Sequence, residues 1–283
     1  MTLAYHVVDV FTDRAFAGNP LAVVLDGDVL STGQMQTLAR EFNLSETTFP
    51  VGATDPAADY RLRIFTPAAE LPFAGHPSVG TAWLLRSLGR VGTGRVVQEC
   101  GAGLLPLEIH GDVVTLTGGQ PSVSDPLDVE PFCAAVGLLP DDAAGPTVRW
   151  AGTGLEFAFL QVGTDAVARS SPNLAALAAI GGVGVSVFSW DPEGRVHARV
   201  FAAAAGVPED PATGSAALGL GVHLVAAGLL PGDGESSYVV EQGLEMGRPS
   251  RLACVVRAEG GRAVEARVSG TVFPVAAGRI AIP

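Results

Sequence analysis

Three side chains in the sequence could move protons: Glu46, His76 and Asp210. Glu46 stands between apolar Leu44 and Phe49. A carboxyl group among apolar neighbours has a raised pKa, which suits a residue that both donates and accepts a proton near neutrality. His76 lies in a glycine- and proline-rich loop, where an imidazole can donate to a carboxylate or pass a proton. The three residues indicate acid/base chemistry, although Glu46 could also be a solvated strand residue, His76 a surface residue, and Asp210 the N-cap of a helix.

Several common kinds of active site are excluded by residues that the chain lacks. No lysine occurs, so neither the Schiff base of a pyridoxal-phosphate enzyme nor the lysine of a phosphate-binding P-loop can form. The dinucleotide-binding pattern G-x-G-x-x-G is incomplete, and the isolated histidines form no metal-binding pattern. Residues 76–80 resemble the nucleophile elbow of serine hydrolases, G-x-S-x-G, but have His at the position of the first Gly. We expect acid/base chemistry with neither cofactor nor metal, or binding without chemistry.

The composition is that of a tightly packed globular protein with an acidic surface. Hydrophobic residues make up 48% of the chain, and 29 acidic against 17 basic residues give a net charge of −12. Such a surface repels phosphate backbones and anionic lipid heads, so we expect neither nucleic acid nor a membrane as a partner. Three widely spaced cysteines, and an N-terminus without the order of a signal peptide, predict reduced thiols and a cytoplasmic protein.

An internal repeat organises the chain. After a shift of 136 positions, residues 63–72 lie over residues 199–208, and most positions are identical or exchange one aliphatic side chain for another. Each copy reads as an alternating strand, a glycine-rich loop and a long apolar helix, so both loops lie at helix N-termini. Unpaired backbone N–H groups there can hold an anion. The two ends could face each other across a cleft and hold one small acidic molecule, or the loops could be ordinary connections.

Hydrophobic periodicity and capping residues predict the other elements. Ser31 and Gln34 form a capping box that opens a helix over Thr32–Phe42, and residues 171–172 (Ser-Pro) open a helix that runs to residue 180. The proline-rich residues 118–131 are the candidate linker. The uncharged residues 212–230 reach the length of a membrane span, but their polar side chains and flanking prolines favour a buried helix. The predicted strands are Tyr60–Phe65, Val113–Thr117, 157–162, 183–188 and 197–201.

Six motifs are distributed along nearly the whole chain. They are Phe16-Ala-Gly-Asn-Pro20, Asn43-Leu-Ser-Glu-Thr47, Arg63-Ile-Phe-Thr-Pro67, Glu70-Leu-Pro-Phe-Ala-Gly-His-Pro77, Glu209-Asp-Pro-Ala-Thr-Gly-Ser-Ala216 and Gln242-Gly-Leu-Glu-Met-Gly-Arg-Pro-Ser250. In order and spacing they resemble the PhzF family, which has a diaminopimelate-epimerase-like fold. The resemblance implies an α/β (α+β) chain of two pseudo-symmetric halves, each a curled, mostly antiparallel sheet around a central helix, with the active site between them. The expected halves are residues 1–118, to which the final strand 272–283 can return, and residues 127–271.

The same resemblance implies roles for the site residues. Glu46 is the expected general acid/base, and His76 and Asp210 help to hold or protonate the substrate. The expected substrate-binding residues are Asn19, Ser45, Gly75, Pro77, Thr213, Gly214 and Ser215. The implied activity is that of a cofactor-free, homodimeric isomerase of the trans-2,3-dihydro-3-hydroxyanthranilate isomerase type, acting on a small carboxylated substrate. The alternative is a non-catalytic protein of the same fold that binds small carboxylates.

A weaker resemblance extends to diaminopimelate epimerase and proline racemase, which use two thiols. The positions that match those thiols look like Ala74 and roughly Pro211, whereas the cysteines are Cys100, Cys133 and Cys254. No sulfur is available where a two-thiol racemase needs one, so that chemistry is not expected.

Overall fold

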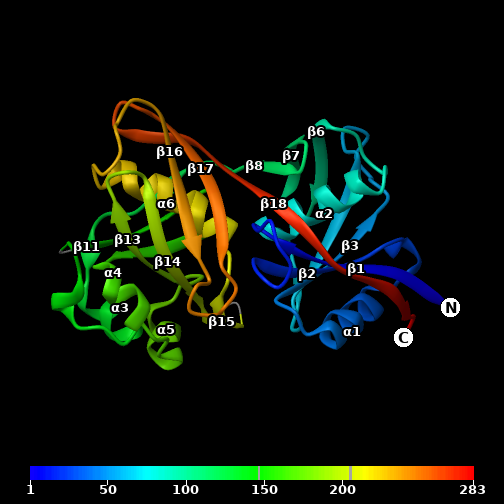
Figure 1. Ribbon diagram of the computed structural model, residues 1–283, viewed down its shortest axis with the longest axis horizontal. Helices are drawn as coiled ribbons and strands as arrows, with labels where there is room; N and C mark the ends of the chain where they lie inside the picture. The colour runs from blue at the N-terminus through cyan, green and yellow to red at the C-terminus, as the bar shows by residue number, and fades with distance from the viewer. Residues whose placement is uncertain (146, 204–205) are drawn as a thin grey trace. The chain divides into compact units, whose positions relative to one another are not determined.

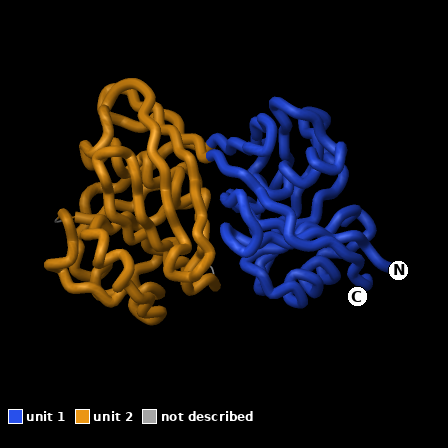
Figure 2. The backbone as a smooth tube through the Cα atoms, viewed as in Figure 1, with its two compact units in different colours: residues 1–117, 269–283 blue, residues 118–268 orange. Residues whose placement is uncertain are grey.

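The chain folds mainly into strands, with few helices, in the computed structural model, which describes residues 1–145, 147–203 and 206–283. Residues 1–117 and 269–283 form one compact unit (unit 1), and residues 118–268 form another (unit 2), coloured separately in Figure 2. The long strand β18 (Arg262–Ala281) begins in unit 2 and continues into unit 1. Unit 1 is thus built from both ends of the chain.

Unit 1 is a curled sheet around the helix α2 (Gly75–Ser87), which is buried along the stretch from Gly75 to Leu85 (Figure 1). The strands pair in the order β18, β1, β2, β3, β4, β6, β7, β8, and β8 pairs with β18, so the sheet closes on itself. Only the β2–β3 and β4–β6 pairs in this series are described as parallel. The strand bounds are β1 Thr2–Val10, β2 Asn19–Val24, β3 Glu46–Val51, β4 Tyr60–Phe65, β5 Glu70–Leu71, β6 Gly94–Cys100, β7 Gly103–His110 and β8 Val113–Thr117.

The helix α1 (Thr32–Phe42) lies on the outside of this sheet, preceded by the short helix η1 (Gly27–Val29). The Ser31 hydroxyl accepts from the Gln34 backbone N–H, and the Gln34 side chain accepts from the Ser31 backbone N–H, which confirms the predicted capping box. The apolar face of α1 packs in one cluster with Phe49 and Phe65 of the sheet. This packing holds the outer face of β3, the strand that begins with Glu46.

Unit 2 repeats this plan around the helix α6 (Gly214–Ala226), which is buried almost throughout. Its strands pair in the order β9, β11, β12, β13, β14, β16, β17, and the β12–β13 and β14–β16 pairs are parallel. The strand bounds are β9 Ser122–Val123, β10 Leu127–Asp128, β11 Thr147–Gly152, β12 Glu156–Gln161, β13 Val185–Asp191, β14 Arg195–Ala202, β15 Val207–Asp210, β16 Gly234–Gln242 and β17 Ser250–Glu259. The outer helices are α3 Glu130–Ala135, η2 Pro140–Asp142, α4 Thr164–Arg169 and α5 Leu174–Ile180.

The uncharged residues 212–230 are the buried helix that the sequence predicted, because α6 occupies the middle of that run. Within the described ranges, the chain has no helix whose length and apolar character would let it cross a membrane. Two other expectations need correction. Residues 171–172 do not open a helix: α5 begins at Leu174, and the Asn173 side chain accepts from the Ala176 N–H as its cap. The expected linker 118–131 contains β9 and β10, both of which pair with β11.

The strand registers and helix starts show that the repeat changes its spacing between β14 and α6. Arg63 in β4 and Arg199 in β14 pair with equivalent positions of β3 and β13, and they are 136 positions apart. The helices begin at Gly75 and Gly214, which are 139 positions apart. Unit 2 therefore carries three more residues in this connection, since 139 − 136 = 3. Residues 204–205, which the repeat matched to residues 68–69, lie outside the described part of the chain.

This insertion corrects two residue matches. The counterpart of Glu70 is Glu209, since each glutamate forms a paired hydrogen bond with the repeated arginine of its own unit. The counterpart of Ala74 is Thr213, because each residue directly precedes the central helix of its unit, whereas Pro211 lies two positions earlier. Neither Ala74 nor Thr213 carries a thiol, so two-thiol racemase chemistry is not expected at these positions either.

His223 of α6 occupies the position that Leu84 holds in α2, and its ring packs against Phe159 and Phe188. Burial, with a smaller contribution from Arg149, lowers the pKa of His223 from 6.5 to about 4. Between these two values the unfolded chain binds a proton that the folded protein does not.

We expect this group to make the unfolding free energy fall as the pH is lowered from about 6.5 to 4, with a slope of about 1.4 kcal/mol per pH unit. Urea unfolding across this range should therefore show a flatter pH dependence for His223→Leu than for the wild type. The control is His110→Leu, because His110 is exposed. If His223→Leu and His110→Leu gave the same profile, this account of His223 would be wrong.

Candidate active site

The first turn of α2 consists of Gly75, His76 and Pro77. Pro77 fits there because the backbone N–H groups of a first turn have no partner within the helix. Ala74 is the N-cap and provides no side-chain hydrogen bond to the helix. The N-terminal end of α2 therefore keeps its positive dipole without a side-chain cap.

A chain of buried hydrogen bonds fixes the start of α2. The Tyr60 hydroxyl donates to Gln98 Oε1 at 2.9 Å, and Gln98 Nε2 donates to the Ser78 hydroxyl at 2.9 Å. Ser78 in turn donates to the carbonyl oxygen of Ala74 at 2.9 Å. Burial raises the pKa of Tyr60 far above its ordinary value, so the phenol stays a hydrogen-bond donor. The loop before His76 is thereby held by buried polar groups.

Glu46 and His76 meet at this end of the helix. Glu46 begins β3, and its Oε2 lies 3.4 Å from His76 Nε2, with 13% of the Glu46 side chain and 5% of the His76 side chain exposed. Burial lowers the pKa of His76 from 6.5 to about 3. The imidazole is consequently neutral at physiological pH, so this pair is a carboxyl group beside a neutral ring rather than a salt bridge.

Two further predicted residues continue this cluster. Asn19 Nδ2 lies 3.2 Å from His76 Nδ1, and the Ser45 hydroxyl donates to Asn19 Oδ1 at 3.3 Å. Asn19 begins β2, and β2 pairs with β3 in parallel, with Leu21 opposite Glu46. Neighbouring strands thus bring Ser45, Glu46 and Asn19 to the start of α2.

In unit 2 the start of α6 is organised differently. Thr213 is the N-cap, but its hydroxyl donates to Asp210 Oδ2 at 2.6 Å rather than capping the helix. Gln242 Nε2 donates to the Asp210 carbonyl oxygen at 2.7 Å, and Gln242 Oε1 accepts from the Thr213 N–H at 3.2 Å. Gly214 and Ser215 follow as the first residues of the helix. Asp210 is therefore held in place by hydrogen bonds from Thr213 and Gln242.

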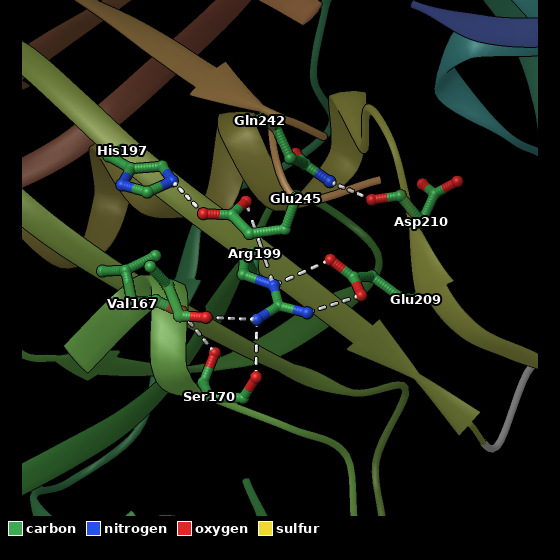
Figure 3. A network of polar contacts seen from close by, with 9 residues as sticks. Val167, Ser170, His197, Arg199, Glu209, Asp210, Gln242 and Glu245 are labelled. Atoms are coloured by element: carbon green, nitrogen blue, oxygen red, sulfur yellow. Dashed lines mark hydrogen bonds and ion pairs between the residues drawn. The ribbon is translucent and has the colours of Figure 1, made fainter. Parts of the chain in front are cut away.

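Arg199 ties this loop to the rest of unit 2 (Figure 3). Its Nε and Nη2 donate to the two carboxylate oxygens of Glu209 at 2.8 Å each, and its Nη1 donates to the Ser170 carbonyl oxygen at 2.5 Å. Glu245 Oε2 lies 4.0 Å from Arg199 Nε, and Glu245 Oε1 lies 2.9 Å from His197 Nε2. One guanidinium group thus joins β14, β15, the end of α4 and the loop after β16. The hydrogen bond to Glu209 raises the pKa of Arg199.

Among the described residues, no cluster of three His, Cys, Asp or Glu side chains has the arrangement of a metal site. The three cysteines are buried and form no disulfide with one another.

The model of the PhzC-PhzF family, described as phenazine biosynthesis-like protein, matches residues 8–278. The chain belongs to this family. Trans-2,3-dihydro-3-hydroxyanthranilate isomerase of Pseudomonas aeruginosa is 38% identical to it over 287 residues, which cover 97% of this chain and 98% of the relative. A PhzF-family phenazine biosynthesis protein of Bacillus anthracis has a crystal structure that covers all of both chains, with a TM-score of 0.89 and 28% identity.

Several relatives are named trans-2,3-dihydro-3-hydroxyanthranilate isomerase, and the chain is an isomerase. Its fold is shared more widely. A hydroxyproline epimerase of Agrobacterium vitis has a TM-score of 0.69 at 17% identity, covering 99% of this chain and 93% of the epimerase chain. At that identity the likeness concerns the fold alone, which is the diaminopimelate-epimerase-like fold that the motifs predicted.

The structure brings together four of the residues selected from the PhzF motifs: Asn19, Ser45, Glu46 and His76. Gly75 and Pro77 flank His76, while Asp210, Thr213, Gly214 and Ser215 lie at the start of α6 in unit 2. Their catalytic and binding roles stay predictions.

The sequence did not single out the residues that hold these loops in place, namely Gln98, Arg199, Glu209 and Gln242. The signals available were the repeated arginine of the two copies and the position of Gln242 at the start of a family motif.

Proposed function

We propose that Glu46 moves a proton between two carbons of a small, carboxylated, unsaturated substrate, without a cofactor. The observation that carries the proposal is the Glu46 carboxyl group 3.4 Å from a buried, neutral imidazole at the uncapped start of a central helix. The P. aeruginosa relative is named for trans-2,3-dihydro-3-hydroxyanthranilate, a molecule with a carboxylate and a partly reduced ring. We propose this compound, or a closely related carboxylated diene, as the substrate.

The proposed reaction needs one group that both accepts and donates a proton. The Glu46 carboxylate removes a proton from one carbon, so that this C–H bond breaks and a carboxyl O–H bond forms. The electron pair left behind spreads over the conjugated substrate, and Glu46 returns the proton to a different carbon. A carboxyl group among largely buried neighbours suits both steps, and fixed geometry supplies much of the rate.

The substrate carboxylate requires its own partner, because the chain is strongly acidic. The first turn of α2 supplies backbone N–H groups and the positive end of the helix dipole. The His76 ring, held neutral by burial, adds hydrogen bonding without adding a charge that would compete for the Glu46 proton. We propose that Gly75, His76 and Pro77 orient the substrate, and that Asp210, Thr213, Gly214 and Ser215 also act on it.

Unit 2 does not repeat the Glu46 and His76 side chains of unit 1. Thr47 pairs with Phe65 in unit 1, and Val185 pairs with Phe201 in unit 2, so the counterpart of Glu46 is Gly184. The counterpart of His76 is Ser215. A racemase needs an acid/base group on each side of one carbon, whereas moving a proton between carbons needs only one such group. Because unit 2 repeats neither Glu46 nor His76 at the equivalent positions, the arrangement favours isomerisation.

The direct test follows turnover and isotope exchange. The protein should be incubated in D2O with trans-2,3-dihydro-3-hydroxyanthranilate and with a panel of cyclic and amino-acid-derived carboxylates, and the products followed by NMR. We expect at least one compound to be converted with deuterium entering a carbon position. If a panel member bound tightly and showed neither conversion nor exchange on long incubation, the isomerase mechanism would give way to a carboxylate-binding role.

Two expectations about the setting of this activity stay predictions. Sedimentation velocity at micromolar concentration should show a homodimer, at twice the monomer mass of 28.8 kDa. The cytoplasmic location inferred from the three cysteines should be visible by fractionation of cells that produce the protein.

A further inference from the structure

The hydrogen bonds around His76 determine which ring nitrogen carries its proton. In the structure the Asn19 amide directs its oxygen, Oδ1, toward Ser45, and the Ser45 hydroxyl donates to it at 3.3 Å. The other end of that amide, Nδ2, faces His76 Nδ1 at 3.2 Å. An amide nitrogen can only donate, so Nδ1 must accept. In a neutral imidazole the single proton then lies on Nε2, the nitrogen 3.4 Å from Glu46 Oε2.

We propose that Asn19 and Ser45 are positioning residues that hold His76 in the Nε2–H form, so that the ring presents a donor to Glu46 and to the substrate. This inference rests on the proposed function of Glu46. It gives Asn19 and Ser45 a different role from the substrate binding that the family motifs suggested, because each directs a polar group toward the next member of this chain.

The local backbone keeps Asn19 in place. Asn19 is fully buried, and the following Pro20 restricts its backbone to an extended conformation. Gly18 has a positive φ of 65°, and a Cβ at that position would overlap the carbonyl oxygen of Val10. The Phe16 N–H donates to Asp9 Oδ2 at 2.7 Å, which ties the preceding loop to β1. The amide is thus delivered to His76 by a loop with little freedom.

The donor on Nε2 matters for the proposed proton transfer. The Nε2–H faces Glu46 Oε2 at 3.4 Å without forming a hydrogen bond to it in the structure, so this donor is available to the carboxylate or to charge that develops on the substrate. With the proton on Nδ1 instead, Nε2 would present a lone pair to the carboxylate. The two tautomers therefore leave the atoms in almost the same positions, but one presents a hydrogen-bond donor to Glu46 and the other presents an acceptor.

The variant that separates these cases is Asn19→Asp, which keeps the shape and replaces the amide donor with a carboxylate acceptor. The carboxylate accepts a hydrogen bond, so Nδ1 should become protonated. In protein labelled with 15N-histidine, we expect the His76 signals of the wild type to show a proton on Nε2 alone, and those of Asn19→Asp to show one on Nδ1. The kcat should fall by roughly 10²- to 10⁴-fold, as for the wrong tautomer in a serine-protease triad, with a smaller change in KM.

Two further variants sharpen the test. Ser45→Ala frees the Asn19 amide to rotate, so we expect a mixture of His76 tautomers and a smaller loss of kcat. Asn173→Asp makes the same chemical change at the cap of α5 in unit 2, where Asp is an equally good cap, and should leave the His76 spectrum and kcat unchanged. Far-UV circular dichroism of each variant checks that it is folded.

The spectroscopic result is independent of substrate, so it separates this inference from the proposed function. A wild-type His76 with its proton on Nδ1 would overturn the positioning role even in an active enzyme. So would an Asn19→Asp protein that kept the wild-type kcat and its pH profile. A wild type with the expected tautomer but no turnover on any carboxylate would instead contradict the function proposed for Glu46.

Discussion

Glu46→Gln is expected to lower kcat by at least roughly 10²- to 10⁴-fold, the usual contribution of a general acid/base. Glutamine keeps the shape of the side chain and its contact with His76 but cannot accept and return a proton. Substrate binding should change little, because the helix N-terminus and His76 are untouched. The measurement is solvent deuterium entering the substrate, together with turnover at saturating substrate. Its control is Glu41→Gln on the exposed side of α1, which should behave like the wild type.

Deuterium exchange tests this prediction separately from turnover. If Glu46 removes the carbon proton, exchange and turnover must fall together. Exchange that persists at the wild-type rate in Glu46→Gln would assign proton removal to another group, and Asp210→Asn would then be the first variant to examine.

Arg199→Met should destabilise the protein by about 3–5 kcal/mol, the usual cost of removing one partner from a buried ion pair. Arg199 is 8% exposed, and its loss would leave the Glu209 carboxylate without its paired hydrogen bonds and two backbone carbonyls without their donor. The repeat provides a matched control. Arg63→Met removes the equivalent paired hydrogen bond to Glu70, whose side chain is 39% exposed, and should cost about 1 kcal/mol or less.

Urea unfolding of both variants at pH 7 measures this difference. The double variant Arg199→Met/Glu209→Met should recover a large part of the loss, because it removes the stranded charge as well. If Arg199→Met and Arg63→Met lowered the unfolding free energy equally, burial would not explain the difference expected between the two ion pairs. Since Glu209 directly precedes Asp210, Arg199→Met should also lower turnover in whatever fraction remains folded.

The elements that the sequence predicted well are those whose signals are local. The capping box before α1 and the alternating residues of β4 and β8 depend on neighbours within a few positions, and the structure places these elements at the predicted residues. The start of α5 was misplaced because Ser171 and Pro172 imitate the cap and first residue of a helix. The real cap, Asn173, lies two residues after Ser171.

The three-residue insertion in unit 2 was hidden for a different reason. At a shift of 136 positions, Ala68 and Ala69 match two alanines of the run that follows β14. Sequence identity alone therefore could not locate the three extra residues. Only strand pairing and the start of α6 show that Glu209, rather than a residue three positions earlier, takes the place of Glu70.

The sequence predicted which residues form the site, but not which of them are hydrogen-bonded to one another or in which direction. Glu46, His76, Asn19 and Ser45 were found through motifs, yet the direction of each bond depends on side chains that are 26 and 57 positions apart. The same holds for Gln242, which reaches a loop 29 and 32 positions earlier in the chain. Such long-range contacts leave no trace in the periodicity of a single sequence.

Gly184 bears on how the two halves could have diverged from a common ancestor. A Cβ at this position would collide with the carbonyl oxygen of Phe201, so any side chain requires the backbone of β13 and β14 to move. A point mutation to glutamate therefore cannot give unit 2 the residue that unit 1 uses. The difference between the two units at this position is therefore one that a single substitution in unit 2 does not remove unless the backbone also shifts.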